Sequence, residues 1–172
     1  METSYIVTFI GDDRPGLVEQ VSNVIESNQG NWHESRLSQL GGKFAGLVLV
    51  SLPAAAAVTL ETELKALSSR GLSVRVTPTS ETATSAVPGR DITLTLMGPD
   101  RLGIVREIAS ALAQRAVNVI EMDSEVKSAP MSAEMMFHAH IEARIPENTD
   151  MDELSDTLDE IANQMTLDID LE

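Results

Sequence analysis

The sequence lacks cysteine altogether. A chain without cysteine cannot form a disulfide framework, use a thiolate as a nucleophile or bind zinc through sulfur. The sequence also lacks any apolar run that approaches the roughly 20 residues needed to span a membrane. Its first residues, METS, lack the basic segment that opens a signal peptide. We therefore expect the protein to be cytoplasmic.

Short catalytic motifs are missing as well. The sequence contains no Gly-x-Ser-x-Gly, no P-loop, no Gly-x-Gly-x-x-Gly and no His-Glu-x-x-His. These motifs position a nucleophile, a nucleotide phosphate, a dinucleotide and a zinc ion, respectively. We therefore expect a protein that is not an enzyme and that needs no cofactor.

Positive charge is scarce. The chain has 12 Lys and Arg residues against 27 Asp and Glu residues, so its net charge is −15. Residues 91–172 hold five basic and 18 acidic residues, whereas residues 1–90 hold seven and nine. A strongly acidic surface repels the phosphates of nucleic acid. If the protein controls a gene, we expect it to act through another protein and not by binding DNA itself.

One eight-residue segment occurs twice, 87 positions apart. GDDRPGLV (residues 11–18) and GPDRLGIV (residues 98–105) each follow a strand-like run and lead into apolar residues at helical spacing. A repeat of this length predicts two similar halves of about 80 to 90 residues. The segment between them is rich in Ser, Thr, Pro and Ala and has no periodicity, which is typical of a linker. We place the first domain at residues 1–77, the linker at 78–90 and the second domain at 91–172.

Both halves show the element order β-α-β-β-α-β, which is ferredoxin-like. We predict an α+β protein of two such units, each an antiparallel sheet with both helices on one face. In the first half we expect strands at residues 5–10, 32–40, 44–52 and 72–76, and helices at 17–28 and 54–69. In the second half we expect strands at 92–97, from 117, at 133–145 and at 166–171, and helices around 104–112 and 151–165.

Local signals predict where several elements end. Gly30 would end the first helix, because glycine adopts the left-handed conformation there without strain. The pair Gly41-Gly42 predicts a tight hairpin. Asp150 and Glu153 predict a capping box at the start of the last helix.

The two Gly-rich turns are the candidate sites, because a helix N-terminus presents free backbone N–H groups to a negatively charged group. The first turn carries Asp12 and Asp13, which could cap the helix and which would repel a phosphate. An amino acid suits this turn better. Its carboxylate would accept hydrogen bonds from the N–H groups near Gly16, and its ammonium would pair with Asp12. Asn31 and Asn118 share one repeat position and could bind both groups of such a ligand.

These residues resemble a known family. Two β-α-β-β-α-β units with Asp-Arg-Pro-Gly-Leu-Val and Asp-Arg-Leu-Gly-Ile-Val are similar to ACT domains, the small-molecule-sensing modules of amino-acid metabolism. A pair of such units without a catalytic domain resembles the glycine cleavage system transcriptional repressor family. The resemblance implies an amino-acid sensor, with glycine as the suggested ligand, that acts through a partner transcription factor.

The resemblance also nominates site residues. In ACT domains the ligand sits at an interface between two modules, where the turn after the first strand and the start of the second strand contact it. Carried over, this arrangement nominates eleven ligand-binding residues: Asp12, Asp13, Arg14, Gly16, Leu17, Asn31, Asp100, Arg101, Gly103, Ile104 and Asn118. The second turn departs from the first in that Pro99, Leu102 and Val117 replace Asp12, Pro15 and Gly30. We therefore favour the first turn.

Two further features allow more than one interpretation. His138 and His140 share one face of the expected strand 133–145 and could offer two metal ligands. No third ligand is set by their spacing, so we assign no metal site. From Glu147 to Glu172 the chain has ten acidic and no basic residues. These residues would form the solvated face of the last helix or a docking surface for a basic partner.

The sequence thus indicates an amino-acid-responsive regulator, with transcription of glycine cleavage as its suggested target. The alternatives are a regulatory subunit of an amino-acid metabolic enzyme and a metal-binding ferredoxin-like module. Because each predicted sheet leaves one face and its edges uncovered, we also expect a homo-oligomer.

Overall fold

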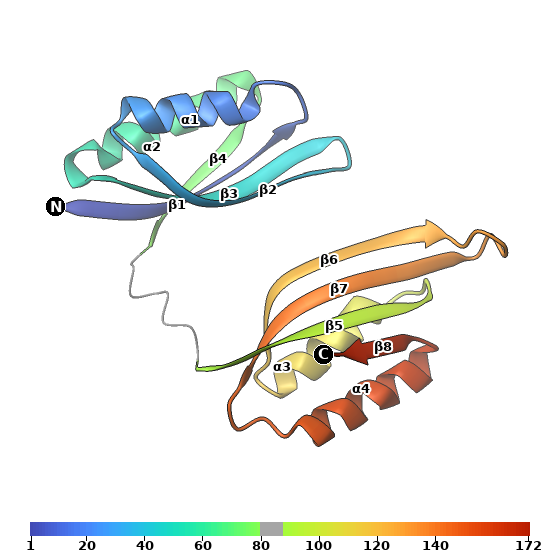
Figure 1. The fold of residues 1–172 in the computed structure, drawn as a ribbon. Helices are drawn as coiled ribbons and strands as arrows, with labels where there is room; N and C mark the ends of the chain where they lie inside the picture. Colours follow the sequence, from blue (N-terminus) through green and yellow to red (C-terminus); the bar gives the residue numbers. More distant parts are fainter. Residues whose placement is uncertain (80–87) are drawn as a thin grey trace. The chain divides into compact units, whose positions relative to one another are not determined.

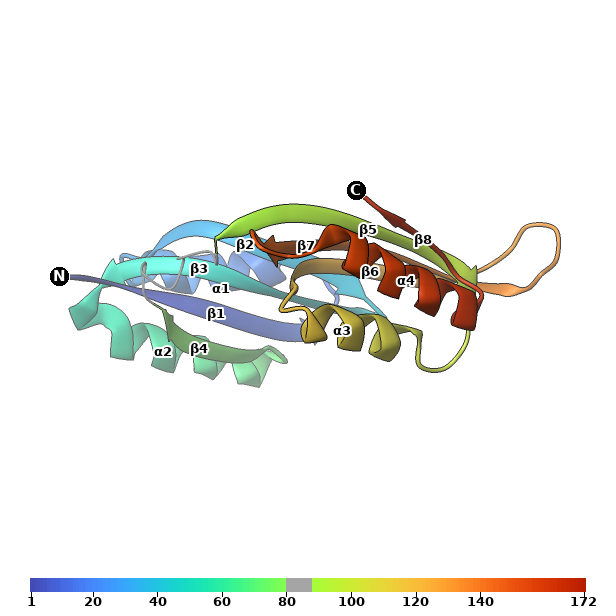
Figure 2. The ribbon, with the colours of Figure 1, turned by 90° about the horizontal axis from the view of Figure 1, so that it is seen from below.

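The computed structural model describes residues 1–79 and 88–172, and residues 80–87 of the predicted linker lie outside the described residues. The chain divides into two compact units, Met1–Thr84 and Ser85–Glu172, which are described one at a time. Figure 1 shows that each unit is a twisted sheet with its helices on one face. Figure 2 shows the same two layers from below.

The first unit follows the predicted element order. Its strands are β1 (Glu2–Asp12), β2 (Asn31–Leu40), β3 (Lys43–Pro53) and β4 (Ser73–Thr79), in the sheet order β2-β3-β1-β4. Its helices are α1 (Leu17–Ser27) and α2 (Ala57–Ala66), with the short 3₁₀ turns η1 (Ala54–Ala56) and η2 (Leu67–Arg70) on either side of α2. All its strand pairs are antiparallel.

The second unit repeats this topology. Its strands are β5 (Gly89–Pro99), β6 (Asn118–Ser128), β7 (Met135–Pro146) and β8 (Asp168–Leu171), in the order β6-β7-β5-β8. Its helices are α3 (Ile104–Gln114) and α4 (Met151–Met165). The predicted fold, α+β with two ferredoxin-like units, is confirmed.

Each unit has its own aliphatic core between the sheet and the two helices. Strand β7 shows how it is built, because every second residue from Phe137 to Ile145 is buried while those between are not. In α1 the buried residues Leu17, Val21 and Ile25 recur every four positions, so one stripe of the helix faces the sheet. Burial of such side chains stabilises a fold by about 1.5–3 kcal/mol each.

Two predictions about helix ends were wrong. Neither Asp12 nor Asp13 caps α1, because Gly16 occupies the N-cap with φ +92° and no side chain caps the helix. Gln29, not Gly30, takes the left-handed conformation after α1, with φ +60°. Position 30 requires glycine because there is no room for a side chain. A Cβ atom there would lie 2.8 Å from the carbonyl oxygen of Ile25.

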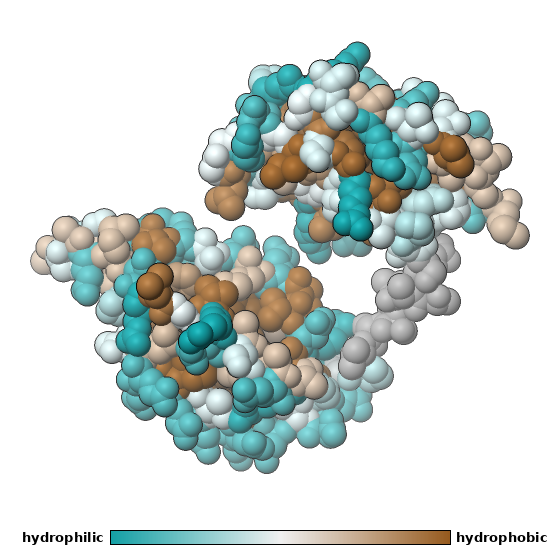
Figure 3. Space-filling view, turned by 180° about the vertical axis from the view of Figure 1, so that it is seen from behind, coloured by the Kyte–Doolittle hydropathy of each residue, from teal (hydrophilic) through white to brown (hydrophobic). Residues whose placement is uncertain are grey.

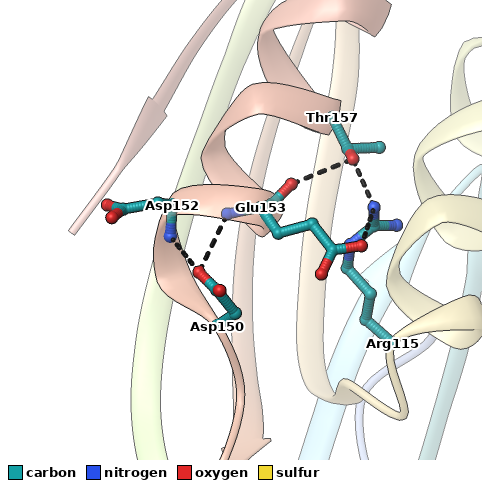
Figure 4. A network of polar contacts seen from close by, with 5 residues as sticks. All are labelled: Arg115, Asp150, Asp152, Glu153 and Thr157. Carbon is teal, nitrogen blue, oxygen red and sulfur yellow. Dashed lines mark hydrogen bonds and ion pairs between the residues drawn. The ribbon is translucent and has the colours of Figure 1, made fainter.

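Of two other end signals, the hairpin was right and the capping box was right in part. Gly41 and Gly42 both have positive φ, as a tight hairpin between β2 and β3 requires. The Asp150 carboxylate accepts hydrogen bonds from the N–H groups of Asp152 and Glu153, at 3.0 and 3.1 Å (Figure 4). The Glu153 side chain instead makes an ion pair with Arg115, at 3.6 Å, so only the Asp150 half of the predicted capping box is confirmed.

A polar contact ties the two helices of each unit together at the same place. In the first unit the buried amide of Asn28, after α1, donates to Glu63 Oε2 of α2 at 2.6 Å and to the Val24 carbonyl at 2.9 Å. In the second unit Arg115, 87 positions later, donates to the Thr157 hydroxyl of α4 (Figure 4). The residue at this repeat position therefore links the two helices in both units, although the residue type differs.

We predict that Asn28→Ala lowers the free energy of unfolding of the first unit by about 1–3 kcal/mol, because the buried Asn28 amide loses its hydrogen bonds to the Glu63 carboxylate and the Val24 carbonyl. Urea unfolding followed by fluorescence of Trp32, the only tryptophan, reports on this unit. The control is Ser27→Ala, which removes an exposed hydroxyl hydrogen bond and should cost under about 0.5 kcal/mol. Equal urea midpoints for the two variants would show that the Asn28 hydrogen bonds contribute nothing to the stability of the first unit.

Candidate functional site

The turns after β1 and β5 have the same backbone conformation. Gly16 precedes α1 with φ +92° and ψ 2°, and Gly103 precedes α3 with φ +93° and ψ −2°. A Cβ atom at Gly103 would meet nothing within 4 Å, and one at Gly16 only the end of the Glu19 side chain at 4.0 Å. The backbone conformation, and not crowding, therefore calls for glycine at both turns.

Both turns leave a helix N-terminus open. The first helical hydrogen bonds run from Gln20 N–H to the Gly16 carbonyl (3.0 Å) and from Glu107 N–H to the Gly103 carbonyl (2.9 Å). The N–H groups before these have no acceptor within the helix. No side chain caps α1 or α3 in the described residues, whereas Asp150 caps α4. The repeated turns can therefore bind an anionic group.

Asp12 is already paired. Its carboxylate, at the end of β1, accepts a hydrogen bond from Lys43 Nζ at the start of β3. This hydrogen bond, the Lys43 charge and the nearby Arg14 charge hold the pKa of Asp12 below its usual range. Asp13 ties the turn to the hairpin through its N–H, which donates to the Gly42 carbonyl at 3.0 Å. A ligand ammonium would compete with Lys43 at Asp12, and Asp13 is the second carboxylate that could accept it.

The turn arginines reach toward the end of the second helix in each unit. Arg14 donates to the Arg70 carbonyl at the end of η2, and Arg101 Nη1 lies 3.5 Å from the Gln164 carbonyl near the end of α4. Helix C-termini favour cations because their last carbonyls lack helical partners. Arg14 and Arg101 therefore link each turn to the C-terminal end of the second helix of its unit.

A hollow of about 560 Å³ lies beside the second turn. Leu102 at its rim is 99% exposed. The hollow is lined by Asp100, Arg101, Leu102, Gly103, Ile104, Val105, Arg106, Ala109, Val126 and Phe137. Four of the residues nominated at the second turn therefore line this hollow. The sequence analysis had favoured the first turn as the ligand site.

Asn31 and Asn118 lie far from the turns of their own units. In the first sheet Asn31 is in register with Ser51, which pairs with Ser4 near the start of β1, whereas the turn follows Asp12. Eight residues of strand separate Ser4 from Asp12, or about 26 Å. Asn118 likewise pairs with Arg144, opposite Asp91, at the other end of β5 from its turn. Within one unit the nominated residues therefore form two separate groups.

Sequence reasoning missed Lys43, which is in direct contact with a nominated carboxylate. Antiparallel pairing of β1 with β3 places it opposite Asp12, and the Gly41-Gly42 hairpin sets where β3 begins. It also missed Val126 and Phe137 beside the second turn. These two come from β6 and β7, so no signal in the local sequence could connect them with the turn.

His138 and His140 lie on the face of the second sheet that the helices leave open. The hollow there, also about 560 Å³, includes Thr95, Asp123, Glu125, Asp168 and Asp170 in its lining. Among the described residues no group of three or more His, Asp or Glu is arranged to hold a metal ion. Nor does any described helix have the length and apolar character to span a membrane.

Comparison with known proteins identifies the class of the first unit. Residues 3–77 match the family model of the ACT domain. The second unit repeats the same topology. The chain is thus built of two ACT-like units, the first of which matches the family model.

Two solved structures resemble the whole chain. One is a protein of unknown function from Galdieria sulphuraria, with a TM-score of 0.84 and 29% identity over 100% of this chain and 98% of that one. The other was provisionally assigned as a glycine cleavage system transcriptional repressor, with a TM-score of 0.74 and 21% identity over 100% of this chain and 97% of that one. The chain resembles that repressor in fold. A search of curated proteins found no match.

We predict that Lys43→Met raises the pKa of Asp12 toward its ordinary value of 3.8, because the hydrogen bond and charge that lower it are removed. A carboxyl whose pKa is lowered by folding adds stability above its unfolded pKa and loses it as the pH falls through the folded value. The Asp12–Lys43 pair should therefore add a small amount of stability at neutral pH, because both side chains are exposed to solvent, and should lose it as the pH falls through the lowered pKa of Asp12. Carboxyl NMR titration measures the shift directly, with Lys65→Met, which breaks an ion pair within α2, as control. An unmoved Asp12 pKa in Lys43→Met would contradict the assignment.

Proposed function

We propose that the protein is an amino-acid-responsive regulator in the cytoplasm, without enzymatic activity, which controls transcription of glycine cleavage through a protein partner. The observation that carries the proposal is the uncapped helix N-terminus behind a left-handed glycine in an ACT domain. The same backbone arrangement recurs at Gly103 in the second unit.

The chemistry of the first turn fits a zwitterion. The free N–H groups at the start of α1 would donate hydrogen bonds to the ligand carboxylate, and Asp13 or Asp12 would accept hydrogen bonds from the ligand ammonium. A phosphate would meet the two carboxylates at close range and be repelled. The ligand class is therefore the free amino acid.

Glycine is proposed as the ligand on the resemblance to the provisionally assigned repressor. Asn31 and Asn118 would contribute to a site only where a second module brings them to a turn. Such a site would couple ligand binding to the way modules assemble. The ligand could then change affinity for a partner by no more than the ratio of its own affinities for the two arrangements.

A protein partner, and not DNA, is proposed as the target. The net charge of −15 opposes direct contact with nucleic acid phosphates. The partner would be a DNA-binding transcription factor. Copurification with a catalytic subunit instead would favour the alternative of an enzyme's regulatory subunit.

We predict that glycine, or another member of a panel of amino acids, binds saturably in calorimetry and raises the melting temperature. At 100 times Kd, binding to the native state adds about 2.7 kcal/mol of stability, which corresponds to a shift of several degrees. If no amino acid in the panel binds or raises the melting temperature, the proposed amino-acid ligand is contradicted.

Gly16→Ala and Gly103→Ala form a matched pair that locates the site. Both place a side chain at a φ near +92°, so both should cost about 1 kcal/mol or more in stability. Binding at the first turn would be lost in Gly16→Ala and kept in Gly103→Ala, and binding at the second turn would show the reverse. Asp13→Asn, which keeps the backbone conformation, tests the ammonium contact separately.

A further inference from the structure

Each sheet has one face that its two helices leave open, as Figure 1 shows. Antiparallel register aligns one residue of each strand in a row across such a face. In the first unit one row consists of Arg36 on β2, Leu47 on β3, Thr8 on β1 and Arg75 on β4. Both neighbours of Thr8 along β1 are buried on the helix side, so this row points to the open face.

The equivalent row of the second unit carries the opposite charge. It consists of Asp123 on β6, His140 on β7, Thr95 on β5 and Asp170 on β8. The repeat aligns the two rows, because Asp123 follows Arg36 by 87 positions. The row therefore has an arginine at each end in the first unit and an aspartate at each end in the second.

The next row toward the turn increases this contrast. It is uncharged in the first unit and adds two carboxylates in the second: Ser38, Ala45, Ile10 and Ser73 against Glu125, His138, Met97 and Asp168. Over the two rows the first face has two arginines and no acidic residue, whereas the second has four carboxylates and no Lys or Arg. The charges of the two open faces are therefore complementary.

The spacing of the opposite charges also matches. Arg36 and Arg75 are on the outer strands β2 and β4 of their sheet, and Asp123 and Asp170 are on the outer strands β6 and β8 of theirs. Three strand spacings of about 4.8 Å separate the outer strands, so the two charges of each row are about 14 Å apart. Because each row carries like charges at its two ends, the rows match whichever way the strands run.

Apolar side chains lie between the charges. On the first face Ile10 is 48% and Leu47 45% exposed, and on the second face Met97, at the repeat position of Ile10, is 42% exposed. Figure 3 shows apolar side chains among hydrophilic ones at the surface of the first unit, at the upper right of the view. The second face is hollow at its two rows, with a volume of about 560 Å³ and with Asp123 and Asp170 in the lining. An exposed leucine between two arginines thus matches a hollow between two aspartates.

We propose that the open face of the first sheet binds the open face of the second sheet in another copy of this chain. Arg36 and Arg75 then pair with Asp123 and Asp170, and Leu47 enters the hollow between them. Arg36 also makes an ion pair with Glu34 at 3.5 Å, but both side chains are more than 60% exposed, so this pair is weak and leaves the guanidinium accessible. The proposal does not depend on amino-acid binding.

Charge reversal in the full chain tests the pairing by sedimentation equilibrium without any amino acid. The wild-type chain should at least double its mass as its concentration rises. Arg36→Glu with Arg75→Glu leaves both rows acidic, and Asp123→Arg with Asp170→Arg leaves both rows basic, so each double variant alone should associate at least tenfold more weakly. An equimolar mixture of the two double variants should associate again, because the acidic rows of one meet the basic rows of the other.

The matched control is Lys65→Glu with Arg106→Glu, which makes the same change in net charge on the exposed surfaces of α2 and α3. This control should associate as the wild type does. The proposal is overturned if the wild-type chain stays monomeric at all concentrations, if both row variants still associate, or if the control loses association equally. A mixture of the two row variants that stays monomeric would overturn it as well.

A single substitution tests the apolar centre of the contact. Leu47→Glu places a carboxylate opposite the acidic hollow and should weaken association at least tenfold. Val58→Glu changes an exposed valine on α2, 77% exposed, and should leave association unchanged. Equal association of these two variants would show that Leu47 is outside the contact and would contradict the proposed pairing.

Discussion

The antiparallel pairing of the first strand with the third in each unit is the constraint on which the other features depend. It brings β1 and β3 together from Glu2 opposite Pro53 to Asp12 opposite Lys43. Alternate residues of these central strands then face the helices and form the core. The same register sets where β1 ends, and with it the position of the turn, the start of α1 and the Lys43 contact to Asp12.

The two units show how one fold can keep a site and change its surroundings. Both turns have a left-handed glycine and an uncapped helix, yet the second has Leu102 and a hollow shared with β6 and β7. The helix tie has likewise changed from Asn28 and Glu63 to Arg115 and Thr157. Backbone geometry is retained because φ near +92° excludes most side chains, whereas surface positions can vary at little cost.

Much of the candidate site could be predicted from the sequence, because its central part is local. The end of a strand, the glycine and the start of a helix all fall within one eight-residue segment. The repeat at 87 residues made that segment recognisable. The relation of Asn31 to the turn could not be predicted, because strand register places the residue at the opposite end of the sheet. The capping role expected of Asp12 also failed, because Gly16 occupies the N-cap of α1. The Asp12 carboxylate instead accepts a hydrogen bond from Lys43 of another strand.

The sequence by itself determined the two-unit organisation, the α+β class, the element order and the two turns. These features follow from hydrophobic periodicity, glycine placement and the repeat, which act over a few neighbouring residues. The tertiary structure decided which groups meet: Lys43 with Asp12, Arg14 with the end of η2, and α3 with the helix-facing side of β6. Such contacts depend on register and on packing between distant segments, where a shift of one residue turns every side chain to the opposite face.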